Sequence, residues 1–458
     1  MGIICVLKDL IIGGGAMSCS NNDILKFIEL NDVKFIRLQF TDIFGRMKNI
    51  AINSKQLERA LEEGIIFDAS AIAGFSEIEQ SDMLLLPDPN TLSIIPWRPQ
   101  HGKVARLICD IKNYDGSQFS GDPRYILKKS AEKATKLGYT FNIGPECEFF
   151  LFHTDSEGRP TTKTHDSAGY FDLAPMDMGE NCRREICMVL EDMGFEIEAS
   201  HHENAAGQHE IDFRYNDVLS AADKIMTFKT VVKIVAQRNG LHATFMPKPI
   251  VDTYGSGMHI NMSISQDGKN LFANENDNRD ISDVAKMFAA GILKHIKGIT
   301  AVSNPLINSY KRFVPGFEAP VHIAWSHMNR SPLLRIPAPK GDASRIELRS
   351  PDPSCNPYLT LALLLEAGLD GLNNKLQISD PIDFNTYNLT PEQEKKYGIE
   401  RLPSNLYLAL EEMKKDSYVK EVLGQHIYEK YIQAKENEWI AYNNSVHSWE
   451  IDNYLSAY

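Results

Sequence analysis

The chain has 458 residues, of which 43% are apolar and 24% are charged, the ordinary composition of a globular protein. Its 61 acidic residues outnumber 48 basic ones, and the net charge of −13 argues against nucleic-acid binding, which needs a basic surface. At about 150 residues per domain, the length predicts roughly three domains or two large ones. A membrane span needs about 18 consecutive apolar residues, and the sequence has no such run.

The first sixteen residues are apolar and rich in glycine, but Lys8 and Asp9 interrupt the apolar run that a signal peptide needs. We interpret residues 1–16 as an extension, either disordered or due to a misassigned start, with Met17 as the alternative first residue. The seven cysteines are odd in number and include no C-x-x-C pair. Reduced thiols in a cytoplasmic protein are therefore expected.

The first part of the chain predicts a small mixed α/β unit. Apolar periodicity and capping residues predict a helix over 24–31, strands over 33–40 and 48–52, a helix over 55–63, and strands over 92–96 and 104–111. The turn-rich segment 114–123 indicates a domain boundary. We therefore expect an N-terminal domain over 17–118 and a second domain over 119–458.

The second part interleaves strands and helices. Helices are expected near 124–137, 178–193, 217–239, 281–302, 356–372, 404–414, 416–423 and 426–441. Strands are expected near 141–152, 195–203, 256–264, 320–325 and 343–350. Hairpin-like spacings favour an α+β fold with a largely antiparallel catalytic sheet over a doubly wound sheet.

The predicted strand over 141–152 carries Glu146 and Glu148 on one face, because side chains alternate along a strand. A solvent-facing pair on an edge strand is the plain alternative. The apolar run at 149–152, however, predicts a strand buried on both faces. Paired carboxylates repel one another there unless a cation or a proton intervenes, so we favour metal binding.

A second acidic segment, residues 198–210, concentrates glutamates and histidines around small residues. It lacks the H-E-x-x-H spacing of zinc proteases, and carboxylate-rich ligation suits Mg²⁺ or Mn²⁺ better than zinc. We favour ordinary core or surface roles for His201, His202 and His209. For Glu203 and Glu210 we favour metal, since they extend the set begun by the paired carboxylates.

Two further segments place polar side chains on one face of a predicted strand and apolar ones on the other. The polar positions are His259, Asn261 and Ser263, and then Arg345, Glu347 and Arg349, with Arg330 and Arg335 upstream. A core histidine and a cross-strand salt-bridge ladder are the plain alternatives. Arginine is the natural bidentate partner of phosphate and carboxylate. Together with the acidic set, these arginines favour phosphoryl transfer, with carboxylates holding metal and arginines holding the phosphoryl group and an acidic substrate.

A series of short motifs covers nearly the whole of residues 22–458. They are F-T-D-I-F-G (40–45), G-P-E-C-E-F-F (144–150), E-A-S-H-H-E (198–203), G-Q-H-E-I-D (207–212), M-P-K-P (246–249), G-S-G-M-H (255–259), N-S-Y-K-R-F-V-P-G-F-E-A-P (308–320), N-R-S (329–331) and R-I-E-L-R (345–349). With them the chain resembles type I glutamine synthetase, in its shorter subtype. The resemblance implies a small N-terminal β-grasp domain, a larger catalytic domain, and a homo-oligomer, a dodecamer of two hexameric rings with each site between neighbouring subunits.

The resemblance also implies roles for individual residues. Ligands of one divalent ion, Mg²⁺ or Mn²⁺, are implied at Glu148, Glu203 and Glu210, and those of a second at Glu146, His259 and Glu347. Contacts to L-glutamate are implied for Gly255, Arg312, Glu318 and Arg349. Contacts to ATP are implied for Glu198, Asn261, Ser263, Arg330, Arg335 and Arg345. The ammonium site is implied at Tyr170 and at Asp68 from the neighbouring subunit.

The implied reaction is the condensation of L-glutamate with ammonium to L-glutamine through γ-glutamyl phosphate, with release of ADP and phosphate. Asp68 would take a proton from ammonium, and Arg330 would neutralise the phosphoryl group in transfer. A closed loop carrying Glu318 would keep water from the acyl phosphate.

Some positions depart from the family pattern. Ala71 and Tyr254 stand where the family usually has Ser and Asn, and Ser76 replaces the Arg of the feedback-inhibited subgroup, so we expect weak inhibition by glutamine. Tyr387 lies where an adenylylated subgroup has its target, but its surroundings differ, and we predict no adenylylation.

Two alternatives remain. A γ-glutamyl ligase that uses an organic amine would typically lack the ammonium Asp and the loop Glu, whereas Asp68 and Glu318 are both present. Tyr254 is the one feature that favours this alternative. A non-catalytic relative would have lost metal ligands, and all the matched positions are filled. We expect no nucleic-acid or membrane partner.

Overall fold

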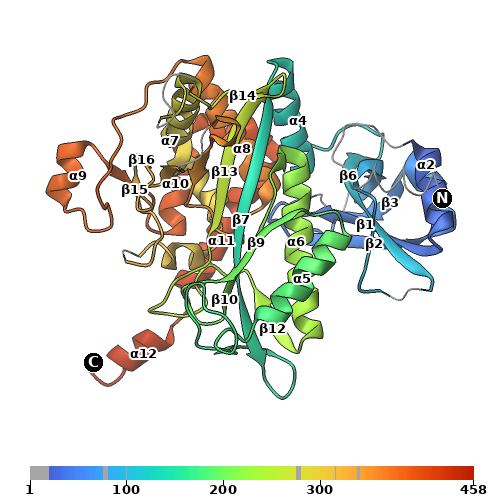
Figure 1. The fold of residues 1–458 in the computed structure, drawn as a ribbon, viewed down its shortest axis with the longest axis horizontal. Coiled ribbons are helices and arrows are strands. Elements are labelled where there is room, and N and C mark those ends of the chain that lie inside the picture. The colour runs from blue at the N-terminus through green and yellow to red at the C-terminus, as the bar shows by residue number, and fades with distance from the viewer. Residues whose placement is uncertain (1–19, 76–80, 99–100, 275–279, 315, 338–340) are drawn as a thin grey trace.

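The structure, a computed structural model, describes residues 20–458 apart from 76–80, 99–100, 275–279, 315 and 338–340. The predictions for residues 1–16 and for Ser76 lie outside this part of the chain. Two units, each with its own sheet, lie side by side (Figure 1). Within the described residues no helix is long and apolar enough to cross a membrane, and the five cysteines there are free thiols.

The first unit is a six-stranded sheet in the order β2-β1-β6-β4-β3, with β5 beside β6. Its strands are β1 (Val33–Thr41), β2 (Met47–Asn53), β3 (Ile65–Asp68), β4 (Asp82–Pro87), β5 (Ser93–Ile94) and β6 (Lys103–Asn113). The central strands β1 and β6 pair in parallel, and the other pairs are antiparallel. This mixed sheet is the β-grasp arrangement that was expected, although β3 and β4 were not predicted.

Capping explains the helices of the first unit. Helix α2 (Asn21–Leu30) begins after Ser20, whose side chain accepts a hydrogen bond from the Asp23 amide in a capping box, and it buries Ile24 and Ile28. Helix α3 (Leu57–Glu63) ends at Gly64, whose φ of 78° suits a residue without a side chain.

The second unit is built on an eleven-stranded sheet with the main order β16-β17-β18-β13-β7-β10-β9. These strands are β7 (Thr140–Thr154), β9 (Ile197–His202), β10 (Gln208–Phe213), β13 (Met258–Gln266), β16 (Trp325–His327), β17 (Leu334–Ile336) and β18 (Ile346–Leu348). Short strands β8 (Pro160–Thr164), β11 (Asn216–Asp217) and β12 (Leu241–Thr244) pair with β7, and β14 (Lys269–Asn270) pairs with β13. Only the β16–β17 pair among the described strands of this sheet is parallel, which confirms the largely antiparallel sheet.

The long predicted helices are present. They are α4 (Pro123–Lys136), α5 (Glu180–Asp192), α6 (Val218–Arg238), α7 (Asp283–Ser303), α8 (Pro357–Asn373), α10 (Leu406–Lys415) and α11 (Ser417–Asn443). Gly424, with φ 74° and ψ 159°, interrupts α11 between the two helices that were predicted there. Helices α9 (Pro391–Tyr397) and α12 (Ser448–Tyr454) were not predicted. The single strand predicted over 320–325 is instead two short strands, β15 (His322–Ile323), which pairs with β19 (Glu400–Arg401), and β16.

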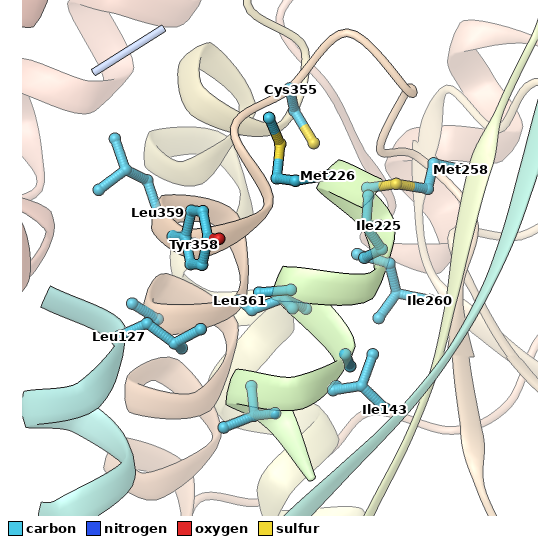
Figure 2. Packing of buried hydrophobic residues seen from close by; sticks show 14 of the residues in the cluster. Leu127, Ile143, Ile225, Met226, Met258, Ile260, Cys355, Tyr358, Leu359 and Leu361 are labelled. Atoms are coloured by element: carbon cyan, nitrogen blue, oxygen red, sulfur yellow. The ribbon is translucent and has the colours of Figure 1, made fainter. Parts of the chain in front are cut away.

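The main core of the second unit lies between the eleven-stranded sheet and the helices that pack on it. Figure 2 shows Met258 and Ile260 of β13 beside Ile225 of α6, with Ile143 of β7 nearby. Because side chains alternate along a strand, the polar residues between these apolar ones point to the opposite face. The packing of one face thereby directs the acidic residues onto the other.

Candidate functional site

Strand register brings the predicted ligands onto one face of the catalytic sheet. On β7, Glu146 lies opposite His259 of β13 and Glu148 lies opposite Glu210 of β10. On the far side of β13, Glu347 of β18 lies opposite Asn261. Residues that are far apart in sequence are therefore neighbours because β7, β10, β13 and β18 are adjacent antiparallel strands.

A first group, Glu146, His259 and Glu347, places its potential ligand atoms within 4.8 Å of one another. The Nδ1 atom of His259 lies 3.2 Å from Glu146 Oε2 and 3.8 Å from Glu347 Oε1. These residues are one of the two sets that the sequence predicted. We call them the Glu347 group.

Positive partners surround the Glu347 group. Glu347 is buried and accepts hydrogen bonds from Arg335 Nη1 at 2.7 Å and Arg349 Nη1 at 2.6 Å. Burial disfavours the charge of Glu146, but hydrogen bonds from His259 and Asn261 outweigh it and lower its pKa to about 2. Burial and the nearby Arg349 lower the pKa of His259, so its imidazole is neutral and offers a lone pair to a metal.

A second group, His201, Glu203 and Glu210, also places its ligand atoms within 4.8 Å of one another. His201 Nδ1 lies 3.3 Å from Glu203 Oε1, and His201 Nε2 lies 3.2 Å from Glu210 Oε1. We call these residues the Glu203 group. The sequence predicted Glu148 as the third member and an ordinary role for His201, whereas the structure brings His201 between the two glutamates.

Glu148 lies at the edge of the Glu203 group and is fixed by hydrogen bonds. It accepts 2.7 Å and 3.0 Å bonds from Gln208 Nε2 and from the Gly257 amide. Its negative charge is close enough to Glu203 to raise the pKa of that residue. The predicted set Glu148, Glu203 and Glu210 is therefore a local cluster in which two members share a histidine.

The carboxyl groups of this cluster lie close enough to raise one another's pKa values. Burial, followed by the charge of Glu148, raises the pKa of Glu203 to about 8. Burial raises the pKa of Glu148 to about 7, and burial with Asp212 raises that of Glu210 well above its ordinary value. A divalent cation would supply the missing positive charge, so the donors present fit Mg²⁺ or Mn²⁺.

A pocket borders both groups. Its lining comprises Glu148, Glu203, Asn204, Gln208, Tyr254, Gly255, His259, Arg312, Phe317, Glu318 and Arg349. A Cβ atom at position 255 would lie 2.4 Å from the Pro247 carbonyl oxygen, so only glycine fits there. Arg312 is buried and donates to the carbonyls of Ser350 and Arg349 at 2.8 Å and 3.1 Å. The pocket is thus lined by carboxylates and by fixed arginines together.

The rim of the site is formed by loops. The Tyr170 hydroxyl hydrogen-bonds with the guanidinium of Arg330, and Tyr387 donates a 3.3 Å hydrogen bond to the Arg330 carbonyl. Glu318 has a φ of 57°, a left-handed conformation that is unfavourable for a residue with a side chain. The sequence did not indicate the contact between Tyr387 and Arg330, because it joins two separate loops.

The predicted ATP contacts extend along the same face. Arg345 donates a 2.8 Å hydrogen bond from Nε to Asn261 Oδ1, which in turn lies beside Glu146. Ser263 follows two residues later on β13. Glu198 lies near enough to Asp212 that its charge contributes to raising the pKa of that residue.

Asp68 is the predicted site residue that lies apart. It ends β3 of the six-stranded sheet, in the other unit of Figure 1. Its carboxylate is exposed and accepts hydrogen bonds from the amide and the hydroxyl of Ser70 at 2.9 Å and 2.7 Å. These bonds hold its pKa below the ordinary value, so the group is ionised.

A buried network supports the Glu203 turn and was missed by sequence reasoning. Asp166 accepts a 2.8 Å hydrogen bond from the Gly207 amide and faces His202 Nε2 at 3.3 Å. The Nδ1 atom of His202 lies 2.7 Å from the Glu203 carbonyl oxygen. Asp166 and His202 thereby fix both ends of the turn that carries Glu203. In the sequence, Asp166 appears only as part of an adjacent His-Asp pair in a loop, and such a pair does not indicate this supporting role.

Comparisons with known proteins agree with this geometry. Residues 32–114 match the family model of the glutamine synthetase β-grasp domain, and residues 120–454 match that of the glutamine synthetase catalytic domain. A glutamine synthetase of Clostridium saccharobutylicum is 58% identical over 439 residues, which cover 96% of this chain and 99% of the relative. A glutamine synthetase of Staphylococcus aureus (strain MW2) is 52% identical over 440 residues, with the same shares covered, 96% and 99%.

Solved structures show the same fold. A GmaS/ADP complex superposes with a TM-score of 0.87 at 31% identity, over 96% of this chain and 100% of that one. A cryo-EM structure of Plasmodium falciparum glutamine synthetase gives a TM-score of 0.86 at 28% identity, over 95% of this chain and 99% of that one. The predicted resemblance and the α+β fold with a β-grasp domain are confirmed. The chain belongs to the glutamine synthetase family.

Proposed function

We propose that this chain catalyses the ATP-dependent condensation of L-glutamate with ammonium to L-glutamine. One observation carries the proposal: two groups of potential metal ligands border a pocket that is also lined by the buried arginines Arg312 and Arg349. Carboxylates that face one another suit divalent cations, and buried arginines suit the carboxylate of an amino acid. The relatives named glutamine synthetase support the same activity.

The proposed metal ligands are Glu148, Glu203 and Glu210 for one ion and Glu146, His259 and Glu347 for the other. The ions, Mg²⁺ or Mn²⁺, would neutralise the charge of the phosphoryl group during its transfer. The raised pKa values of Glu148 and Glu203 and the neutral imidazole of His259 support these assignments.

We assign the substrate contacts as follows. L-Glutamate is bound by Gly255, Arg312, Glu318 and Arg349, and ATP by Glu198, Asn261, Ser263, Arg330, Arg335 and Arg345. The γ-carboxylate of glutamate attacks the γ-phosphorus of ATP, and ADP leaves. Arg330, which is held by Tyr170 and Tyr387, is placed at the rim to stabilise the charge that develops in this step.

Ammonium is bound by Tyr170 and by Asp68 of a neighbouring subunit in this proposal. Because Asp68 is ionised, it attracts the cation and takes its proton. The ammonia so formed attacks the γ-carbonyl carbon of the acyl phosphate, the bond from that carbon to the phosphate oxygen breaks, and phosphate leaves. Asp68 lies in the β-grasp unit of its own chain, and in this proposal a second chain supplies it. We place the two domains at 17–118 and 119–458.

The exposed apolar surface of helix α12 supports an oligomer. This helix extends away from the body of the molecule (Figure 1), and Trp449 and Leu455 are 61% and 74% exposed. Apolar residues at such exposure favour contact with another chain. We propose a homo-oligomer, a dodecamer of two hexameric rings, located in the cytoplasm, where the free thiols remain reduced.

An assay of substrate choice tests the proposed reaction. Phosphate release from ATP in the presence of Mg²⁺ is measured with glutamate plus ammonium, and with glutamate plus a panel of organic amines. We expect ammonium to be the preferred amine. Activity with amines but none with ammonium would contradict the proposal and favour an amine ligase, the alternative that Tyr254 suggests.

Subunit mixing tests whether the site is shared. Asp68→Ala and Glu203→Gln are each expected to inactivate the enzyme, but through residues that different subunits supply to one site. After the two proteins are dissociated and reassembled in equal amounts, about a quarter of the sites regain both native residues. Ammonium-dependent activity should return accordingly. An inactive mixture would show that both residues come from one chain.

A further inference from the structure

An aromatic floor continues the ligand-bearing face of β7. Because side chains alternate, Phe150 and Phe152 share the face of Glu146 and Glu148. The two rings are buried and stacked, with centroids 5.5 Å apart and planes 10° from parallel. With Ala205 they form a small cluster separate from the main core, and Tyr254 packs against it.

Tyr254 connects this floor to the loop that carries Glu318. Its ring meets Phe317 edge to face, with centroids 5.9 Å apart and planes at 89°. The ammonium group of Lys248 lies 4.2 Å from the centroid of the Phe317 ring and also donates to the Thr253 carbonyl. Phe317 is therefore held by one aromatic edge and one cation.

Lys248 is itself fixed. Its amide donates a 2.8 Å hydrogen bond to Asn308 Oδ1, and its carbonyl accepts a 3.0 Å bond from Asn308 Nδ2. Tyr254 is fixed by the buried floor. Both partners of Phe317 thus belong to ordered parts of the catalytic unit, whereas the next residue, Glu318, has an unfavourable φ of 57°. The loop needs contacts of this kind to keep that conformation.

We propose that Tyr254, Phe317 and Lys248 form a clasp that holds Glu318 over the glutamate pocket, with Tyr254 as a positioning residue. The inference rests on the proposed function and adds a role for a residue that differs from the usual Asn at this position. An Asn side chain has no ring to place against Phe317. Tyr254 and Phe317 both line the pocket together with Glu318, so the clasp acts within the pocket wall itself.

The clasp has a chemical consequence. If water reaches γ-glutamyl phosphate, its oxygen attacks the γ-carbonyl carbon, the bond from that carbon to the phosphate oxygen breaks, and glutamate and phosphate are released. ATP is then consumed without glutamine formation. A loop that is already ordered excludes this water and also lowers the ordering cost of binding glutamate.

The first measurement is the ratio of phosphate to glutamine, together with the KM for glutamate, in the full-length enzyme. Tyr254→Leu keeps apolar packing on the floor but removes the edge-to-face contact, and Tyr254→Phe keeps the ring. We expect Tyr254→Leu to raise the KM for glutamate roughly 3- to 10-fold and the ratio above that of the native enzyme. Tyr254→Phe and the exposed-site control Tyr114→Leu should match the native enzyme, as should the KM for ATP in all variants.

Amide hydrogen exchange provides a second readout that does not require turnover. Exchange of residues 316–319 should be faster in Tyr254→Leu and in Phe317→Leu, and no faster in the double variant than in Phe317→Leu alone. Native exchange and native KM in Tyr254→Leu would overturn the clasp. If the native enzyme forms no glutamine, the proposed function fails, and the exchange rates still decide the clasp.

Discussion

The two metal-binding groups of the site differ in how their negative charge is balanced. In the Glu347 group, Arg335 and Arg349 each donate to Glu347, and Glu146 has a pKa of about 2. In the Glu203 group, the pKa of Glu203 is raised to about 8 by burial and by Glu148. The first group is compensated by arginines of the protein, whereas the carboxyl groups of the second raise one another's pKa values.

The two groups have similar spacing between their ligand atoms, so the difference between them lies in the charge of the ligands. The arginines keep the Glu347 group ordered and ionised before any ion binds. In the Glu203 group, burial disfavours ionised carboxylates, so the group holds protons that an arriving ion must displace. We therefore expect binding at the Glu203 group to be more sensitive to pH than binding at the Glu347 group.

The largest effect is expected when Glu203 is replaced by Gln. The loss of one ligand removes several kcal/mol of phosphoryl-charge stabilisation, so kcat/KM for glutamine formation should fall roughly 10³-fold. In the metal-free protein at a pH above about 8, where Glu203 is ionised, the same change should raise the melting temperature, because it removes a repelling carboxylate. Glu146→Gln is the matched variant in the compensated group and should lower that temperature. Equal shifts in both variants would show that the two groups do not differ.

Arg349, which is buried, and Arg345, which is partly exposed, provide the next test. Arg349 and Arg345 both lie two residues from Glu347, but Arg349 is 3% exposed and bonds to Glu347, whereas Arg345 is partly exposed and bonds to Asn261. Arg349→Met should lower the free energy of unfolding by about 3 kcal/mol, since it leaves a buried carboxylate less compensated. Arg345→Met should cost less than about 1 kcal/mol. Chemical denaturation of both variants measures the difference, and comparable losses would contradict it.

The pH dependence of the metal-free protein sharpens the comparison further. The folded-state pKa values of Glu148 and Glu203, about 7 and 8, exceed their ordinary value of 4.5. The folded state therefore holds more protons, and stability should fall as the pH rises from 4.5 to 8. Saturating Mg²⁺ should flatten this decline. For Glu146 the pH effect has the opposite sign, because its pKa is lowered to about 2. Its contribution to the free energy of unfolding is lost only as the pH falls from 4.5 to 2.

The parts of the fold that sequence alone predicted are those with long local patterns. The alternation of β13 and the paired carboxylates of β7 indicated which side chains share a face, and long apolar periodicity predicted α6, α7 and α8. Strands β3 and β4 and helix α12 are short, so their patterns are too brief to detect.

The remaining features depend on register between distant segments. His201 joins Glu210 because β9 and β10 pair with these two residues opposite each other, and a residue pattern cannot predict that pairing. Likewise, the Asp166 network and the Tyr254–Phe317 contact join loops that are distant in sequence. The resemblance supplied residue roles, but not these supporting contacts.

His201 offers the smallest and most specific test of the Glu203 group. Burial lowers the pKa of His201, so its ring is neutral and carries one proton. Its Nδ1 atom lies 3.3 Å from the His202 carbonyl oxygen, which places the proton on Nδ1. The lone pair of Nε2 therefore faces Glu210 Oε1 at 3.2 Å. Two acceptors at this distance need a proton or a metal ion between them. His201→Gln should therefore weaken Mn²⁺ binding about 10-fold, an effect typical of a supporting residue, and Glu148→Gln should weaken it more. Calorimetric titration measures both affinities. The reverse order would make His201, rather than Glu148, the third ligand of this ion.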